Sequence, residues 1–250
     1  MVVNLTTLRH RWEFVRHLRA RQVWTRCART GKRRLLQRWP AFAHRPAPGG
    51  VTLAPDAPVS PFAPGAGCEQ TGPRRYRLTF LNRARDFEIP FDWHRAELNV
   101  GNRLWKLNLH YMEYLAAVDD AAFIELVDDW IRGNPAYHRE YWADSWNSYT
   151  LSIRVVAWMQ QLAARRAALP GDFLRRCESS LAQQLRFLRA NLEFDVGGNH
   201  LMKNLRALAW AGRTGARKVD LTRLLVSLWP SFLRAGKTLL ARAVAHHTDW

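Results

Sequence analysis

A hydrophobic repeat of helical period runs through most of the second half of the chain and constrains its fold more than any other feature. In residues 174–192, apolar residues recur at steps of three or four: Leu174, Cys177, Leu181, Leu185, Leu188 and Leu192. Residues spaced in this way lie on one face of an α-helix. The pattern therefore predicts a long helix that buries this face against other elements.

The same pattern predicts five further helices between residues 102 and 245. Their ranges are 102–118, 120–132, 148–168, 200–211 and 219–245. Short stretches that contain Gly or Pro separate several of them, and Pro230 predicts a kink or break in the last one. Helices joined by short loops form antiparallel hairpins, and pairs of hairpins form a bundle, a solenoid or an α/α toroid. The period alone does not choose between these architectures.

Residues 1–40 are predicted to form a basic helical arm. Apolar residues recur there at helical spacing and arginines occupy the other faces; the apolar positions are Leu8, Trp12, Val15 and Leu18. In one interpretation such an arm binds a membrane surface or a polyanion. In the other, which we favour, the helix packs on the main domain and exposes its arginines.

A linker and a short β element separate this arm from the helical region. Eight of the twelve prolines lie between residues 40 and 75, and we predict a linker over residues 41–75. Tyr76, Leu78 and Phe80 alternate with other residues, which is typical of a strand. The chain is therefore predicted to be all-α, with one short β element near residues 76–91.

The net charge of +17 is concentrated at the two ends of the chain. Residues 1–75 carry 14 Lys and Arg against 3 Asp and Glu, and residues 213–250 carry 7 against 2, whereas residues 76–212 carry 17 against 16. Lysine accounts for five of the 38 basic residues, which is typical of a biased genomic base composition. We expect the ends to attract polyanions through plain electrostatics, without specific recognition of nucleic acid.

Several classes of protein are excluded by composition. The three cysteines, Cys27, Cys68 and Cys177, are too few and too widely spaced for a disulfide scaffold or a CxxC-type zinc site. His246-His247 has no third ligand in view, so no metal site and no cofactor is predicted. No apolar run is long enough for a transmembrane helix, and no secretory signal is evident. The cytoplasm is therefore the default location.

Polar and aromatic residues gather in three clusters at predicted helix starts and in the loops before them. The clusters are residues 108–111, 142–154 and 197–204. Several of the twelve tryptophans adjoin them, and a tryptophan face stacks well on the C–H groups of a sugar ring. Most tryptophans in such a protein fill the core, and Trp146, inside a polar loop, is the best candidate for a sugar contact.

Taken in order, these clusters resemble the heparinase II/III family of polysaccharide lyases. Residues 104–115, LWKLNLHYMEYL, are similar to the family's LW-x-x-NLHY-x-x-YL segment. The resemblance covers about residues 76–212 well and residues 6–30 weakly. It continues through Asp129-Trp130-Ile131, Asn134-Pro135, Trp146, Tyr149, Ser152, Arg154, Trp158, Gly198-Asn199-His200-Leu201, Asn204, Ala207-Leu208 and Ala211-Gly212.

The resemblance implies an N-terminal α/α toroid over residues 76–212 and a lyase activity on polysaccharides that contain uronic acid, such as heparan sulfate or alginate. In β-elimination the proton on C5 is abstracted once hydrogen-bond donors offset the charge of the neighbouring carboxylate. A Tyr or His then takes the proton and returns one to the departing O4. The family exports many of its members, so the periplasm is a second expected location.

The resemblance also implies roles for individual residues. Asn199 would offset the carboxylate, and His200 would assist it or act as a base for one substrate epimer. The other residues implied to contact an anionic polysaccharide are Tyr149, Arg154, Trp146, Asn108, His110 and Tyr111.

Each of these residues also has a structural interpretation. Asn199 follows two glycines and is suited to cap a helix. His200 shares a helical face with polar neighbours, and Arg154 is flanked by apolar residues that suit a buried, ion-paired arginine. His110 and Tyr111 are as well suited to packing behind a site as to lining it.

The resemblance ends near Arg213. The family continues with an Asp-Gly pair and a Glu-x-Ser-Pro-x-Tyr-His segment whose tyrosine is the expected acid and base, followed by a β-sandwich domain. Residues 213–250 contain no tyrosine and are predicted to form an atypical basic helical tail. We therefore expect a truncated or frameshifted lyase that is impaired as this chain alone. The alternatives are a non-catalytic helical carbohydrate-binding module, an inactive pseudoenzyme, or an unstable fragment.

Overall fold

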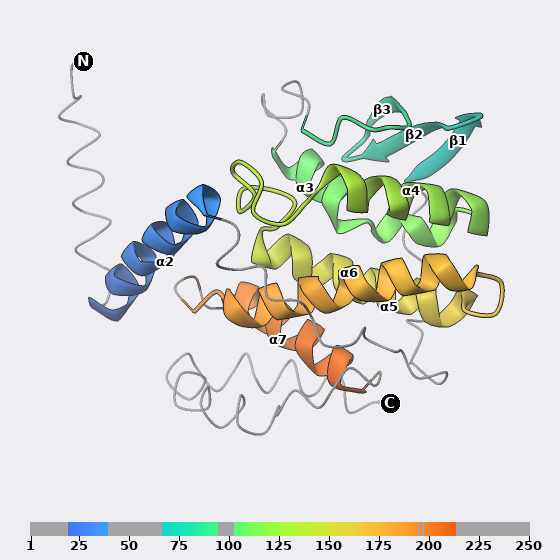
Figure 1. Ribbon diagram of the computed structural model, residues 1–250. Coiled ribbons are helices and arrows are strands. Elements are labelled where there is room, and N and C mark those ends of the chain that lie inside the picture. The colour runs from blue at the N-terminus through green and yellow to red at the C-terminus, as the bar shows by residue number, and fades with distance from the viewer. Residues whose placement is uncertain (1–19, 40–66, 95–102, 195, 197, 214–250) are drawn as a thin grey trace, which may run out of the picture.

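The computed structural model describes residues 20–39, 67–94, 103–194, 196 and 198–213, and within them the chain is mostly helical with one small antiparallel sheet (Figure 1). The predicted helix 219–245, the first half of the basic arm and most of the predicted linker lie outside these residues. The helices are α2 (Ala20–Arg38), α3 (Arg103–Tyr111), the 3₁₀ helix η3 (Glu113–Ala117), α4 (Asp120–Gly133), α5 (Ser148–Arg165), α6 (Gly171–Ala190) and α7 (Gly198–Arg213).

The sheet has the strand order β1-β2-β3, formed by β1 (Cys68–Gly72), β2 (Arg75–Phe80) and β3 (Arg83–Glu88). Tyr76 and Leu78 of β2 point into the core, as their alternation predicts, while the β2–β3 pair Arg77 and Asp86 is exposed. Leu81 and Asn82, both at positive φ, form the tight turn between β2 and β3. The sheet begins earlier than predicted, because β1 lies within the range assigned to the linker.

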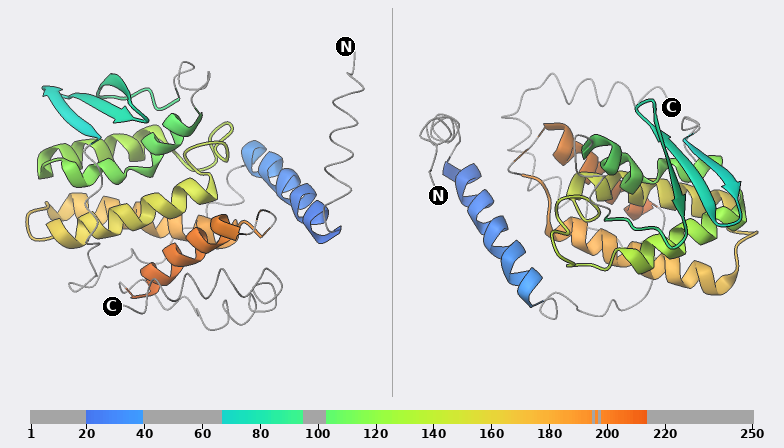
Figure 2. Two further views of the ribbon diagram at one scale, coloured as in Figure 1. Left: turned by 180° about the vertical axis from the view of Figure 1, so that it is seen from behind. Right: turned by 90° about the horizontal axis from the view of Figure 1, so that it is seen from above.

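The helices behind the sheet are stacked in two layers. In one layer α5 lies between α3 and α7 and contacts both, and in the other α6 packs against α4 while also contacting α5 and α7. The sheet covers the side of the stack formed by α3, η3 and α4, away from α7 (Figure 2). Among the described helices, none is long and apolar enough to cross a membrane.

The predicted helix 102–118 is divided in the structure. Met112 adopts the left-handed conformation at φ 57°, so α3 ends at Tyr111 and the chain continues as η3. The side chain of Met112 is fully buried, and its carbonyl accepts the N–H of Leu115. Core packing therefore overrides helical continuity at this point.

A buried carboxylate fastens the segment after the sheet to α4. Asp129 Oδ2 accepts the backbone N–H of Phe91 at 3.0 Å and the indole N–H of Trp93 at 2.9 Å. The side chain of Asp129 is almost fully buried, so these two donors satisfy an otherwise costly charge. They also fix the indole of Trp93 against Gly133, the last residue of α4.

We expect Gly133→Ala to lower the free energy of unfolding by about 1–3 kcal/mol. A Cβ atom at residue 133 would lie 2.5 Å from Cδ1 of Trp93, and the indole cannot move away without losing its bond to Asp129. Urea denaturation of the variant measures this loss. Gly171→Ala is the matched control, because its added methyl group meets nothing closer than 3.7 Å. Equal stability of the two variants would contradict the prediction.

Candidate functional site

Three predicted site residues meet where α3 ends and where α5 and α7 begin. The rings of Tyr149 and His200 have centroids 4.5 Å apart, and the ring of Tyr111 meets that of Tyr149 edge-on at 6.2 Å. Tyr111 is nearly buried, Tyr149 is half-buried, and 43% of the His200 side chain is exposed. The group therefore rises from the core to the surface, with the imidazole outermost.

A buried carboxylate lies behind the imidazole. Glu193 Oε1 is 3.3 Å from Nδ1 of His200, and the Glu193 side chain is 4% exposed. Nδ1 of His200 is itself buried and makes no hydrogen bond to the described residues in this geometry, so Glu193 places a negative charge beside the ring and does not fix its tautomer. His200 therefore combines a partly exposed imidazole with a buried carboxylate next to its inner nitrogen, which are residue types used in acid–base chemistry.

Asn204 holds the loop that carries Glu193. Its amide Nδ2 donates to the backbone carbonyl of Ser148 at 3.2 Å and to Glu193 Oε2 at 3.3 Å, while its Oδ1 accepts the backbone N–H of Glu193 at 3.1 Å. Asn204 is fully buried. The start of α5, the loop after α6 and the first turns of α7 are thus joined through one side chain.

Asn199 lies next to His200 and is exposed. Helix α7 begins at Gly198, whose φ of +49° suits glycine, so Asn199 belongs to the first turn of the helix and is not the residue before it. Among the described residues, no partner holds the Asn199 side chain. Its amide is available to a ligand, together with the N–H groups that a helix start leaves unpaired.

Two further groups set the charge around this cluster. Burial raises the pKa of the Tyr111 hydroxyl to about 12, with smaller contributions from Tyr149 and Glu113, so Tyr111 stays neutral at ordinary pH. Lys203, one helical turn after His200, is partly buried, and burial together with Arg206 lowers its pKa. The cluster therefore combines a neutral hydroxyl donor with a nearby amine.

Three other predicted site residues lie in the core and surround Trp130 instead. Its indole N–H donates to Nδ1 of His110 at 3.3 Å, the guanidinium carbon of Arg154 lies 3.9 Å from its ring centroid, and the ring of Trp146 is 6.3 Å away. The side chains of His110 and Arg154 are fully buried, and that of Trp146 is 2% exposed. These three residues do not join the surface cluster.

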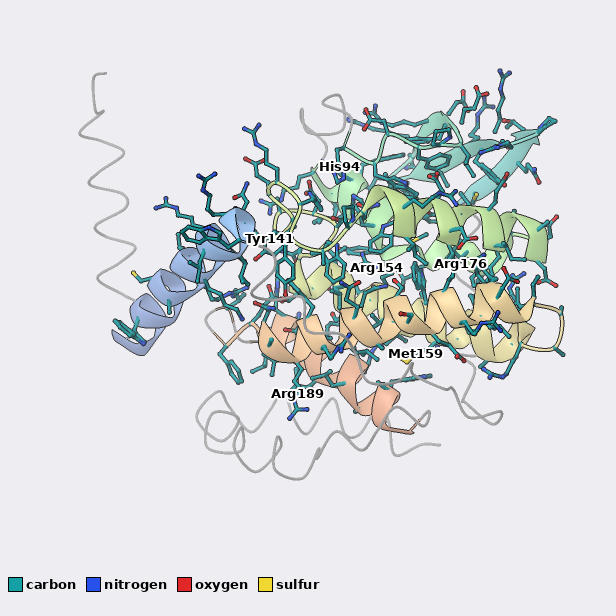
Figure 3. The ribbon with its side chains drawn as sticks, viewed as in Figure 1. His94, Tyr141, Arg154, Met159, Arg176 and Arg189 are labelled. Atoms are coloured by element: carbon teal, nitrogen blue, oxygen red, sulfur yellow. The ribbon has the colours of Figure 1, made fainter. Side chains whose placement is uncertain are left out.

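Arg154 is buried without an acidic partner among the described residues. Its Nε donates to Gln184 Oε1 at 2.8 Å and its Nη1 to the carbonyl of His110 at 3.1 Å. Figure 3 shows it among the stacked helices, whereas Arg176 and Arg189 are exposed. Burial lowers the pKa of Arg154 well below its usual value. The side chain is placed to hold the end of α3, directly before Tyr111, and not to meet a sugar.

Trp146 and Asn108 are also held by internal contacts. The indole N–H of Trp146 donates to the carbonyl of Asn134 at 3.0 Å, and the ring packs on Phe187. Asn108, half-buried on α3, donates to the carbonyl of Leu104 at 2.8 Å. Trp146 thus fills the core, and Asn108 caps a carbonyl of its own helix.

A serine and a histidine in the loop between α4 and α5 form a second arrangement with catalytic residue types. Nε2 of His138 is 2.8 Å from Oγ of Ser145, and its Nδ1 is 2.7 Å from the carbonyl of Arg139. Ser145 is fully buried, so no substrate reaches its hydroxyl. The pair therefore secures the loop. Across the described ranges, no group of His, Cys, Asp and Glu is arranged to hold a metal ion.

Sequence reasoning missed Glu193, and it gave Lys203, which lies within the 197–204 cluster, no role of its own. Glu193 lies in a loop without a periodic pattern, so nothing in the sequence pairs it with His200. Lys203 shares a helical face with His200 at spacing i, i+3, which is a signal that could have identified it.

Comparison of the chain with protein-family models, with curated proteins and with solved structures finds no match.

Proposed function

We propose that the chain is a polysaccharide lyase of the heparinase II/III type, which binds uronic-acid-containing polysaccharide at the Tyr111–Tyr149–His200 cluster. It cleaves this polymer by β-elimination at a reduced rate, because residues 213–250 lack the family's acid and base tyrosine. One observation carries the proposal: an exposed imidazole has a buried carboxylate beside it and lies against a tyrosine ring, next to Asn199, whose side chain has no partner among the described residues. The sequence resemblance assigns Asn199 and His200 to the same role.

Asn199 supplies the electrostatic part of the reaction. The C5 proton of a uronate is a weak acid, because its loss puts charge beside an ionised carboxylate. Donors that offset the carboxylate charge make the loss easier. The exposed amide of Asn199 and the N–H groups of the first turn of α7 are such donors.

His200 supplies the proton transfers. Its Nε2 takes the proton from C5, the electron pair of that bond forms the C4–C5 double bond, and the C4–O4 bond breaks. The imidazolium, stabilised by Glu193, then returns the proton to the departing O4. Because the proton taken from C5 is the one returned to O4, the enzyme neither gains nor loses a proton. The hydroxyls of Tyr149 and Tyr111 hold the sugar by hydrogen bonds.

The two-layer stack is in this proposal a segment of an α/α toroid. The alternation of α3, α5 and α7 in one layer with α4 and α6 in the other agrees with successive hairpins of such a fold. In this arrangement the starts of α5 and α7 lie at the same end of the stack, where the cluster is found.

A non-catalytic carbohydrate-binding module is the second candidate. Residues 213–250 contain no tyrosine, whereas the resembling family places its acid and base tyrosine in the corresponding segment. A chain that keeps the binding cluster without this residue would bind uronic polymer and form no product.

Binding is tested with oligomers of polymannuronate. We expect Tyr149→Ala to weaken binding of a short oligomer about tenfold, because one ring and one hydroxyl contact are lost together. Tyr149→Phe keeps the ring and should lose less affinity. Leu104→Ala, at an exposed position on α3, should leave the affinity unchanged. Isothermal titration calorimetry measures each affinity.

The outcomes separate the two candidates. Binding together with the ultraviolet absorbance of an unsaturated uronide supports the lyase. Binding without that absorbance supports the binding module. Equal affinity of Tyr149→Ala and the unmodified chain contradicts both, because the cluster would then not be the binding site.

A further inference from the structure

Helix α2 is docked beside the candidate site by its C-terminal half. Nζ of Lys32 donates to the carbonyl of Ala190 at 2.9 Å and to Oδ1 of Asn191 at 3.2 Å, and the guanidinium of Arg33 lies 5.6 Å from the ring centroid of Trp142. Leu36, on the same part of the helix, is buried. In Figures 1 and 2 this end of α2 is the one nearest the helical stack.

The docking point is continuous with the site. The hydroxyl of Ser148 donates a hydrogen bond to the carbonyl of Asn191 at 2.6 Å, and the carbonyl of Ser148 accepts one from Nδ2 of Asn204. Glu193, behind His200, lies two residues after Asn191. A ligand that leaves the site past this loop therefore meets α2.

The exposed face of α2 carries an apolar stripe with a large residue at each end. Trp24 is 75% exposed, Leu35 47% and Trp39 52%, and the positions between Trp24 and Leu35 on this face are small residues. At 1.5 Å per residue the stripe is about 22 Å long. The exposed positions, at steps of three or four, are Trp24, Ala28, Gly31, Leu35 and Trp39.

Cations border this stripe. Helix α2 contains seven Lys and Arg and no Asp or Glu. Arg34 and Arg38, one turn apart beside Leu35 and Trp39, are exposed and have no partner among the described residues. The face therefore combines flat apolar surfaces with exposed guanidinium groups, which bind carboxylates and sulfates in a fork geometry.

We propose that this face of α2, defined by Trp24, Arg34, Leu35, Arg38 and Trp39, is an extended binding surface for an anionic polysaccharide that runs out of the candidate site. The proposal rests on the proposed function, because it takes the same polymer as its ligand. Tryptophan rings stack on the C–H faces of the sugars and the two arginines pair with their acid groups.

The residues of the stripe favour a polysaccharide over a lipid surface. Amphipathic helices that insert into membranes present a broad apolar face. Here the middle of the stripe consists of Ala28 and Gly31, which offer little apolar area to acyl chains. A polysaccharide does not need a broad apolar face, because its sugar rings stack on single indole rings such as those of the two separated tryptophans.

The test compares short polymannuronate oligomers, which fill only the site, with long ones that reach α2. We expect the double variant Arg34→Gln, Arg38→Gln to lose at least about tenfold in affinity for long oligomers, and to reduce the slope of log K against log salt by about 1–2. Its affinity for short oligomers should not change. Trp39→Ala should weaken binding of long oligomers in the same way.

The control is the double variant Arg175→Gln, Arg186→Gln, which removes two exposed arginines from α6 and gives the same net charge. Equal losses in both double variants would overturn the proposal, because net charge would explain them. The proposal would also be overturned if the Arg34→Gln, Arg38→Gln variant lost binding to phosphatidylglycerol vesicles but kept its affinity for long oligomers, because α2 would then bind a membrane.

The same measurements distinguish a failure of the α2 surface from a failure of the proposed function. If Tyr149→Ala weakens short-oligomer binding while the α2 variant binds long oligomers normally, the site is supported and the α2 surface is refuted. If the unmodified chain binds neither length, the proposed function fails and the α2 surface fails with it.

Discussion

Replacing Arg154 by alanine should lower the free energy of unfolding by about 3–5 kcal/mol, the range seen when a buried, hydrogen-bonded charged side chain is truncated. The change leaves Gln184 Oε1 and the His110 carbonyl without their donor and opens a cavity over the ring of Trp130. Urea denaturation measures the loss. Arg103→Ala, at an exposed position on α3, is the matched control and should change stability by less than about 0.5 kcal/mol.

Arg154→Met separates a structural role from a role in binding. Methionine keeps an unbranched chain over Trp130 and removes a buried charge that has no acidic partner among the described residues, so this variant should be more stable than Arg154→Ala. Because the guanidinium is fully buried, the folded methionine variant should bind short oligomers as the unmodified chain does. A folded Arg154→Met protein that has lost binding would instead show that this arginine meets the substrate.

The helical part of the fold was predictable because its signal is local. The stripe over 174–192 is observed as α6, whose Cys177, Leu181 and Leu188 are fully buried. The predictions for 120–132, 148–168 and 200–211 correspond to α4, α5 and α7 within a few residues. The break at Met112 was not predictable, because it depends on tertiary packing that no period records.

The candidate site was predictable only in part. Tyr149 and His200 lie at two helix starts that are distant in sequence, and the resemblance named both. It also named Arg154, His110 and Trp146, which gather around Trp130 inside the stack. A polar residue in a helix gives the same sequence pattern whether it faces a cleft or fills a core, so the sequence does not separate the surface cluster from the residues around Trp130. The exposure of the side chains in the structure separates them.

Replacing His200 by glutamine should reduce the rate of unsaturated product formation by at least about 100-fold, because glutamine has no basic nitrogen to take the C5 proton. Its amide is close to imidazole in size and still reaches Glu193, so substrate affinity should change by less than about threefold. Glu193→Gln should have a smaller effect on the rate, since it removes the negative charge beside the imidazolium and leaves the base in place. Continuous ultraviolet absorbance measures the rates, and calorimetry the affinities.

His94→Gln is the matched control for this experiment. His94 is an exposed histidine near His138, and it is not among the residues of the Tyr111–Tyr149–His200 cluster, so its replacement should leave the rate unchanged. An unchanged rate in His200→Gln would exclude His200 as the base and transfer the role to Tyr149, the tyrosine whose ring lies against it. A large rate loss together with a large affinity loss would make His200 a binding residue. A rate loss with affinity intact identifies it as the group that moves the proton, because transition-state stabilisation alone has then been removed.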